Sequence, residues 1–174
     1  MFAGKTEHMI ARLRQRQAQG KRVTAFKHSI DDRYDPNHLV THRRDCFDAV
    51  RITDAAAILD LCGEAELVAI DEGHFFKSPL ISVVQELADR GVDVLVAGIT
   101  FDAWGREFEP IPQLARLADD EVVKRAPCRV CGEPSPFSQR ITRIDDVHMV
   151  GGLDDYEPRC GAHFTPLPGP PGIG

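Results

Sequence analysis

The sequence lacks several features that would assign it to a broad class. Its formal net charge is −6, so no excess of Lys and Arg indicates a nucleic-acid partner. No apolar run reaches the roughly 18 residues of a membrane-spanning helix, and the N-terminus lacks the charged-then-apolar layout of a signal peptide. With 43% hydrophobic and 28% charged residues among 174, the composition is that of a globular domain. We expect a cytoplasmic protein that binds neither nucleic acid nor a membrane.

Cysteine is scarce and odd in number, with five in all, which argues against a disulfide framework. Four of the possible metal ligands fall in two segments of matched C-x-x-ligand spacing. Three thiolates and one imidazole make a closed tetrahedral zinc site of the structural kind. The sequence therefore predicts a structural Zn²⁺ held by Cys128, Cys131, Cys160 and His163. The remaining Cys46 and Cys62 are expected to be small buried residues.

The order of apolar segments predicts an α/β fold. Residues 67–70 are continuously apolar and end in Asp71-Glu72, as expected for a strand covered on both faces in a parallel sheet. A helical pattern over 80–90 and an apolar strand over 92–97 complete a βαβ unit. The other expected elements are an amphipathic helix over 6–19, a strand near 23–26, a short strand within 45–53, and a helix over 54–62 capped by Asp54.

The chain opens with the second half of a phosphate-binding loop. Residues 1–6 read Met-Phe-Ala-Gly-Lys-Thr and match x-x-x-Gly-Lys-[Ser/Thr] ahead of a helix. Gly4 would let the backbone approach a phosphate, Lys5 would reach the outer phosphates, and Thr6 would bind Mg²⁺. The first glycine of the motif and its leading strand would precede Met1, so we expect the true start to lie upstream. Alone, Gly-Lys-Thr fits an ordinary helix start equally well.

An acid pair follows the apolar strand. Ligands of open α/β sheets bind beyond the carboxyl ends of the strands, where Asp71 and Glu72 stand. One carboxylate there would hold Mg²⁺, and its neighbour would act as a general base toward a hydroxyl. The alternative is two acids that begin a solvated loop, and Phe75-Phe76 argues against it.

These segments, in order along nearly the whole chain, resemble the cellular-type (type II) thymidine kinases. Residues 31–34 (Asp-Asp-Arg-Tyr) resemble the family's Asp-x-Arg-Tyr segment. Residues 71–76 (Asp-Glu-Gly-His-Phe-Phe) resemble its Asp-Glu-[Gly/Ala]-Gln-Phe-Phe signature, and residues 147–156 resemble its lasso loop, which the zinc segments bracket. The resemblance implies a P-loop domain over 1–126 that lacks its first strand, a zinc-stabilised lasso module over 127–164, and a homotetramer. The Pro/Gly-rich tail over 165–174 is expected to be disordered.

The resemblance also implies roles for single residues. Glu72 would be the general base that takes the proton of the 5′-hydroxyl of thymidine or deoxyuridine, and Arg33 would neutralise the γ-phosphoryl group that leaves ATP. The ATP and Mg²⁺ site would comprise Gly4, Lys5, Thr6, Arg33 and Asp71. The nucleoside pocket would be lined by Met1, Phe75, Ile99, Trp104, Gly151, Gly152 and Tyr156.

Two substitutions depart from the family pattern and bear on the choice of nucleoside. Ala103 stands where the family has the Phe that stacks on the base, so Trp104 or Phe101 would supply the ring. His74 stands where the family has Gln. Three hypotheses follow: a thymidine kinase, a kinase of the same fold for another nucleoside, or a non-catalytic zinc-stabilised module with a degenerate P-loop.

Overall fold

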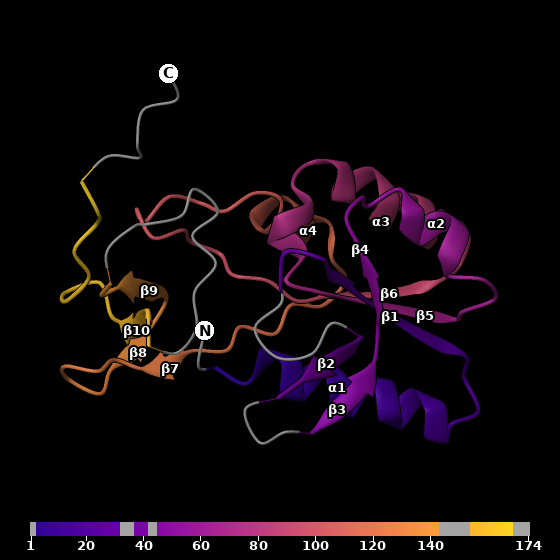
Figure 1. Ribbon diagram of the computed structural model, residues 1–174, viewed down its shortest axis with the longest axis horizontal. Coiled ribbons are helices and arrows are strands. Elements are labelled where there is room, and N and C mark those ends of the chain that lie inside the picture. Colours follow the sequence, from indigo (N-terminus) through magenta and orange to yellow (C-terminus); the bar gives the residue numbers. More distant parts are fainter. Residues whose placement is uncertain (1–2, 32–36, 42–44, 143–153, 169–174) are drawn as a thin grey trace.

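The computed structural model describes residues 3–31, 37–41, 45–142 and 154–168, and within them a parallel sheet lies between two layers of helix (Figure 1). The sheet has the strand order β4-β1-β5-β6, and all of its pairings are parallel. Its strands are β4 (Val50–Ile52), β1 (Val23–His28), β5 (Leu67–Asp71) and β6 (Asp93–Val96). The helices are α1 (Lys5–Ala18), α2 (Ala57–Leu61), α3 (Pro79–Asp89) and α4 (Ile111–Leu117), with a 3-10 turn η1 (Gly73–Phe76) after β5.

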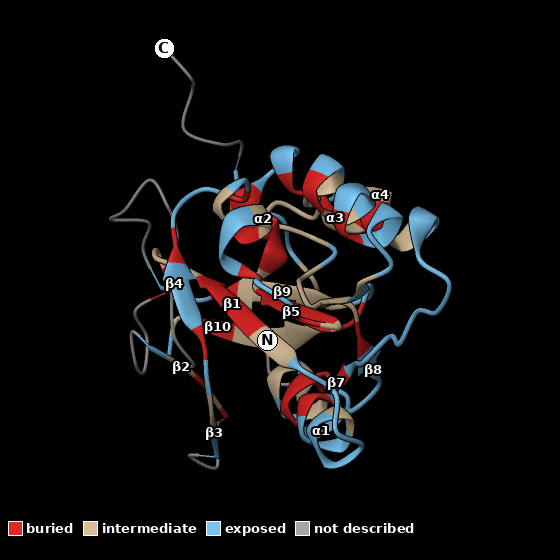
Figure 2. Cartoon of the chain, turned by 90° about the vertical axis from the view of Figure 1, so that its right-hand side faces the viewer, coloured by how far each residue is buried: buried red, intermediate tan, exposed pale blue. Residues whose placement is uncertain are grey.

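Strand β5 is buried along its whole length because each of its faces packs on a separate apolar cluster. Leu67 and Ala69 pack with the buried face of α1, as predicted for the amphipathic helix. Val68 and Ile70 point to the opposite face and pack with α2, α3 and α4. Figure 2 shows the buried strands of the sheet between α1 on one side and α2, α3 and α4 on the other. The continuous apolar run therefore indicates a strand with helices packed on both of its faces.

The segment 45–53 differs from the single short strand that the sequence predicted. It holds two strands, β3 (Cys46–Asp48) and β4, which separate at Ala49. β3 pairs antiparallel with β2 (His38–Val40), whereas β4 pairs with β1. The prediction that Cys46 is buried is wrong, because β3 forms a two-stranded pair outside the main sheet and leaves that side chain exposed. Cys62 is buried, as expected.

Helix α2 is shorter than the predicted helix over 54–62, and Asp54 does not cap it. The Asp54 carboxylate accepts a hydrogen bond from the Ala56 N–H at 2.9 Å, and its carbonyl accepts one from the Ala57 N–H. Asp54 therefore forms a turn just before the helix. Short acidic side chains favour this kind of local hydrogen bond to the backbone.

The C-terminal part is built from short antiparallel pairs. β7 (Ala126–Pro127) pairs with β8 (Pro134–Ser135), and β9 (Phe137–Arg140) pairs with β10 (Tyr156–Arg159). We call residues 126–164 the zinc module, after the ligands that they contain. Among the helices of the described ranges, none combines the length and the apolar composition that crossing a bilayer requires.

Candidate functional site

The carboxyl edge of the sheet brings the start of α1 and the end of β5 together. The Thr6 hydroxyl donates a hydrogen bond to Asp71 Oδ2 at 3.1 Å, across 65 positions of sequence. Gly4, just before α1, has φ +68°, a left-handed conformation that glycine adopts without steric cost. Lys5 is near enough for its positive charge to act on the Asp71 carboxyl. The Gly-Lys-Thr segment and the acid pair therefore share one edge of the sheet, as the sequence predicted.

Asp71 is a buried acid whose surroundings disfavour its ionised form. Burial, followed by the negative charge of Glu72, raises the pKa of Asp71 to about 7. The Glu72 N–H, 3.0 Å from Asp71 Oδ1, and the Lys5 ammonium act in the opposite direction. A carboxylate in this position gains from a bound cation, because a positive charge offsets the cost of ionising it away from water.

Glu72 occupies an unusual backbone conformation at the edge of the sheet. Its φ of 49° lies in the left-handed region, which costs a non-glycine residue on the order of 1 kcal/mol. That turn carries the chain from β5 into η1. The carboxylate keeps a side-chain exposure of 14%, so it borders on solvent beside the buried Asp71. A carboxylate that borders on solvent in this way is suited to accept a proton.

His74 lies beside Glu72 and is 3% exposed. Its Nδ1 is 3.6 Å from Glu72 Oε2, which is longer than a hydrogen bond. The imidazole lies between aromatic rings, with centroids 4.2 Å from Phe75 and 4.6 Å from Phe108. Packing therefore fixes the ring next to the carboxylate, a placement that the signature motif alone did not reveal.

A buried ion pair lies next to Asp71, and the sequence pattern did not predict it. Lys27 is 3% exposed, and its Nζ lies 3.8 Å from Asp31 Oδ2. In the register of the sheet, Lys27 is the partner of Asp71. The signal in the sequence was a lysine directly after Ala25-Phe26 in the predicted strand, four residues before an aspartate. Lys27 and Asp31 thus add a cation and an anion to the same edge.

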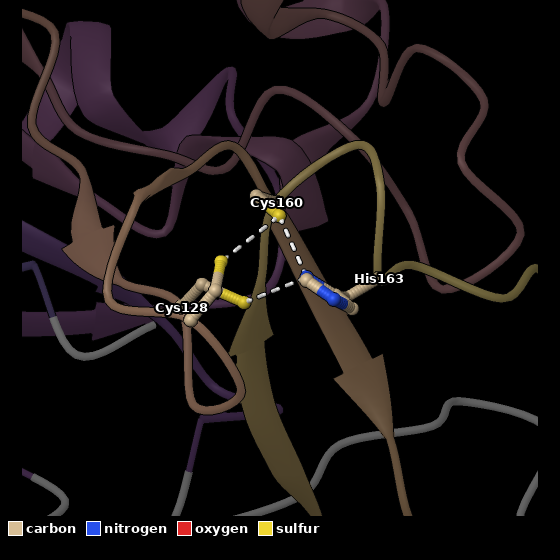
Figure 3. A group of neighbouring side chains, drawn as sticks. Cys128, Cys160 and His163 are labelled. Atoms are coloured by element: carbon tan, nitrogen blue, oxygen red, sulfur yellow. Dashed lines mark hydrogen bonds between the residues drawn. The ribbon is translucent and has the colours of Figure 1, made fainter.

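The four predicted zinc ligands converge in the zinc module, and Figure 3 shows three of them, Cys128, Cys160 and His163. Their ligand atoms all lie within 4.8 Å of one another. Cys131 Sγ is 3.6 Å from Cys160 Sγ, and His163 Nδ1 is 3.2 Å from Cys160 Sγ and 3.9 Å from Cys128 Sγ. A zinc tetrahedron with bonds of about 2.0–2.3 Å has edges of roughly 3.5–3.8 Å, so the donor set and its spacing fit the ion.

Two thiols of this cluster, those of Cys128 and Cys131, have pKa values displaced in opposite directions. Burial opposes ionisation of Cys128, but hydrogen bonds from the backbone around Cys160, Cys131 and Val130 outweigh it and lower its pKa to about 6. At Cys131 a backbone hydrogen bond at Glu133 favours the thiolate, yet burial and the neighbouring thiols raise the pKa. One thiolate thus forms readily and makes the next less favourable, an arrangement that a divalent cation relieves.

The residues predicted to line a nucleoside pocket lie on three segments. Phe75 in η1 and Ile99 after β6 are half-buried. Tyr156 in β10 is buried, and its hydroxyl accepts a hydrogen bond from Arg140 Nη1 at 3.1 Å. The predicted residues Met1, Arg33, Gly151 and Gly152 lie outside the described residues.

The two rings considered as substitutes for the missing Phe at position 103 have other neighbours. Trp104 is half-buried, with the Arg106 guanidinium 5.1 Å from its ring centroid and its Nε1 donating to the Pro168 carbonyl at 3.4 Å. Phe101 packs on Phe137 of the zinc module, with centroids 4.9 Å apart. Ala103 itself is 8% exposed.

Comparison with known proteins gives one consistent result. The sequence model of a family described as thymidine kinase matches residues 1–164. A thymidine kinase of Rhodothermus sp. (strain ITI 518) is 40% identical over 166 residues, which are 95% of this chain and 78% of that protein. A thymidine kinase of Bdellovibrio bacteriovorus is 40% identical over 167 residues, which are 95% of this chain and 82% of that protein.

Proposed function

Because the chain belongs to the thymidine kinase family, we propose that it transfers the γ-phosphoryl group of ATP to the 5′-hydroxyl of thymidine or deoxyuridine. The observation that carries this proposal is the meeting of Lys5 and Thr6 with Asp71 and Glu72 at one edge of the sheet. A phosphate-binding helix start and an acid pair are the two halves of a phosphoryl-transfer site.

In the proposed reaction the residues mainly position groups and balance charge. Gly4 and the N–H groups at the start of α1 face the phosphates, and the Lys5 ammonium neutralises their outer oxygens. Glu72 accepts the proton of the 5′-hydroxyl as that oxygen bonds to the γ-phosphorus. The bond between the γ-phosphorus and the bridging oxygen breaks, and ADP leaves with that electron pair.

The side chains that would hold Mg²⁺ are Asp71 and Thr6. Their oxygens suit a hard cation, and a bound cation would offset the burial and the Glu72 charge that raise the pKa of Asp71. When bound, Mg²⁺ would neutralise charge on the β- and γ-phosphates. Arg33, which lies outside the described residues, is proposed from the family resemblance to assist at the γ-phosphoryl group.

For the nucleoside we propose a pocket bordered by Phe75, Ile99, Trp104 and Tyr156, with Met1, Gly151 and Gly152 contributed by segments outside the described residues. The rings of Phe75 and Trp104 are half-buried, so each would contact a base with the part that remains exposed. Ala103 provides less volume than the Phe of the family pattern. That difference motivates the alternative of a kinase for another nucleoside.

We further propose that Cys128, Cys131, Cys160 and His163 hold a structural Zn²⁺, and that the enzyme assembles as a tetramer in the cytoplasm. A closed Cys₃His set leaves no position for a reacting molecule. Light scattering should give about four times the 19.3 kDa of one chain.

The proposal is tested by turnover with a panel of nucleosides. The purified protein, with ATP and Mg²⁺, is incubated with thymidine, deoxyuridine, deoxycytidine and purine deoxynucleosides, and the products are separated chromatographically. We expect thymidine and deoxyuridine to give the highest kcat/KM. A clear preference for another base would favour the alternative kinase, and no turnover of any nucleoside would favour a non-catalytic module.

A further inference from the structure

Three phenylalanines form a row between the zinc cluster and the loop that follows β6. Phe137 and Phe164 stack with centroids 4.4 Å apart and an interplanar angle of 15°. Phe101 lies 4.9 Å from Phe137 on a third segment. Phe164 directly follows the zinc ligand His163, and its N–H donates to the carbonyl of the ligand Cys160 at 2.9 Å. We call Phe101, Phe137 and Phe164 the aromatic staple.

The loop over 98–108 is an ordered unit held by its own hydrogen bonds. The Phe108 N–H donates to the Thr100 carbonyl at 2.8 Å, and Phe101 forms a bridge with Glu107. The Asp102 carboxylate accepts hydrogen bonds from two backbone N–H groups across the turn, at 2.9 Å each. These amides are therefore protected from exchange as long as the anchors of the loop keep the turn closed.

One face of this loop lies directly under the staple. At Gly105, which has φ +77°, an added Cβ would be 2.8 Å from Phe164 Cε1. No side chain fits there without displacing the ring. The Phe164 ring thus packs on the loop backbone itself, and this contact joins the loop to the segment that carries two zinc ligands.

The other end of the loop touches the segment of the general base. The Phe108 ring lies 4.6 Å from the His74 ring, and His74 Nδ1 lies 3.6 Å from Glu72 Oε2. At the start of the loop, a Cβ on Gly98 would lie 3.6 Å from His74 Nδ1. Loop 98–108 is therefore anchored to the zinc module on one side and to the acid edge on the other.

We propose that Phe164 is a positioning residue for the nucleoside: its ring, fixed by metal binding at His163 and Cys160, holds loop 98–108 in place beside the acid edge. Occupancy of the zinc cluster then sets the affinity for the nucleoside through the staple. This inference rests on the proposed kinase function, since the predicted pocket residues Ile99 and Trp104 belong to the loop. The Glu72 segment retains its own packing in the sheet, so the effect falls on nucleoside binding more than on the chemical step.

The test compares hydrogen exchange and kinetics in Phe164→Ala and wild type, both loaded with zinc. In the absence of nucleoside, we expect amide exchange over 100–108 to rise at least several-fold in the variant, with zinc content unchanged. The KM for thymidine should rise about tenfold, and the KM for ATP should stay within twofold. Phe164→Tyr, which keeps the ring, should restore both readouts. Ile141→Ala is the matched control, because Ile141 lies in the same module but is 54% exposed and outside the staple.

Zinc removal supplies the second arm. Chelation should increase amide exchange over 100–108 in wild type. It should cause little further increase in Phe164→Ala, because zinc removal and the substitution break the same chain of contacts. Equal loosening by chelation in both proteins would show that the coupling bypasses Phe164 and would overturn the proposal. Unchanged exchange over 100–108, or an unchanged thymidine KM, in zinc-loaded Phe164→Ala would overturn it as well. Thymidine turnover by wild type tests the proposed function separately, and the exchange measurement does not depend on it.

Discussion

The acid edge of the sheet and the zinc cluster both gather charged ligands, but different forces hold them together. Asp71 and Thr6 meet because β5 and α1 are packed by apolar side chains on each other, and a buried core surrounds them. The zinc ligands lie on segments with small strand pairs, outside the two apolar clusters that pack on the main sheet. The fold preorganises the first site through its core, whereas the second, if it holds the proposed Zn²⁺, would gain order from its metal.

The largest effect should follow from Glu72→Gln. We expect kcat to fall at least ~100-fold, because the amide cannot accept the proton of the 5′-hydroxyl. The melting temperature should change little, since the sheet that places residue 72 is held by its core. Steady-state rates and thermal melts measure the two effects. Glu64→Gln, at an 88% exposed side chain, is the control, and full turnover by Glu72→Gln would remove Glu72 from its role.

Cys128→Ser should separate the two regions. We expect zinc binding to be lost and the zinc module to loosen, while the main sheet keeps its cooperative thermal transition. Metal analysis and far-UV circular dichroism melts provide the measurements. Cys46→Ser, at an exposed cysteine outside the cluster, should keep its zinc. If Cys128→Ser retains a full equivalent of zinc, the ligand assignment is wrong.

Asp71→Asn should reveal how much stability the protein without ligands loses by ionising Asp71. The pKa of Asp71 is about 7 in the fold and near 3.9 when unfolded. The folded state therefore binds more protons between these values, so the stabilisation from Asp71 is complete below pH 4 and is lost as the pH rises to 7.

Without Mg²⁺ and nucleotide, Asp71→Asn should melt a few degrees above wild type at pH 8, and the difference should shrink toward pH 4. Melting curves from pH 4 to pH 8 measure it, and comparing the two proteins cancels the titration of the zinc ligands. A difference that does not vary with pH would contradict the assignment of the raised pKa to Asp71.

The smallest effect is expected from Arg14→Ala. Arg14 forms a two-pronged ion pair with Asp45, at 2.7 and 2.6 Å, but both side chains are about half exposed. Exposed pairs of this kind contribute about 0–1 kcal/mol. Denaturant unfolding should show a loss within that range, with kcat unchanged. A larger loss would mean that this contact anchors α1, and with it the phosphate loop.

The short motifs were predictable from the sequence because their chemistry is local. Gly4-Lys5-Thr6, Asp71-Glu72 and the four zinc ligands are set by residue type and spacing alone, and the structure brings each set together. The apolar run of β5 likewise predicted a strand covered on both faces. By contrast, the split of 45–53 at Ala49 depends on which partner each half pairs with, which the sequence pattern does not state.

By itself, then, the sequence determined the kind of chemistry and the α/β core, since motif spacing and the pattern of apolar residues are properties of the chain. Only the tertiary structure decided what covers each residue: the burial of Lys27 with Asp31, the place of His74 between two rings, and the contact of Phe164 with Gly105. Periodicity records that a face is buried. Which residues cover that face depends on how distant segments pack, because the hydrophobic effect is not directional and does not specify a partner.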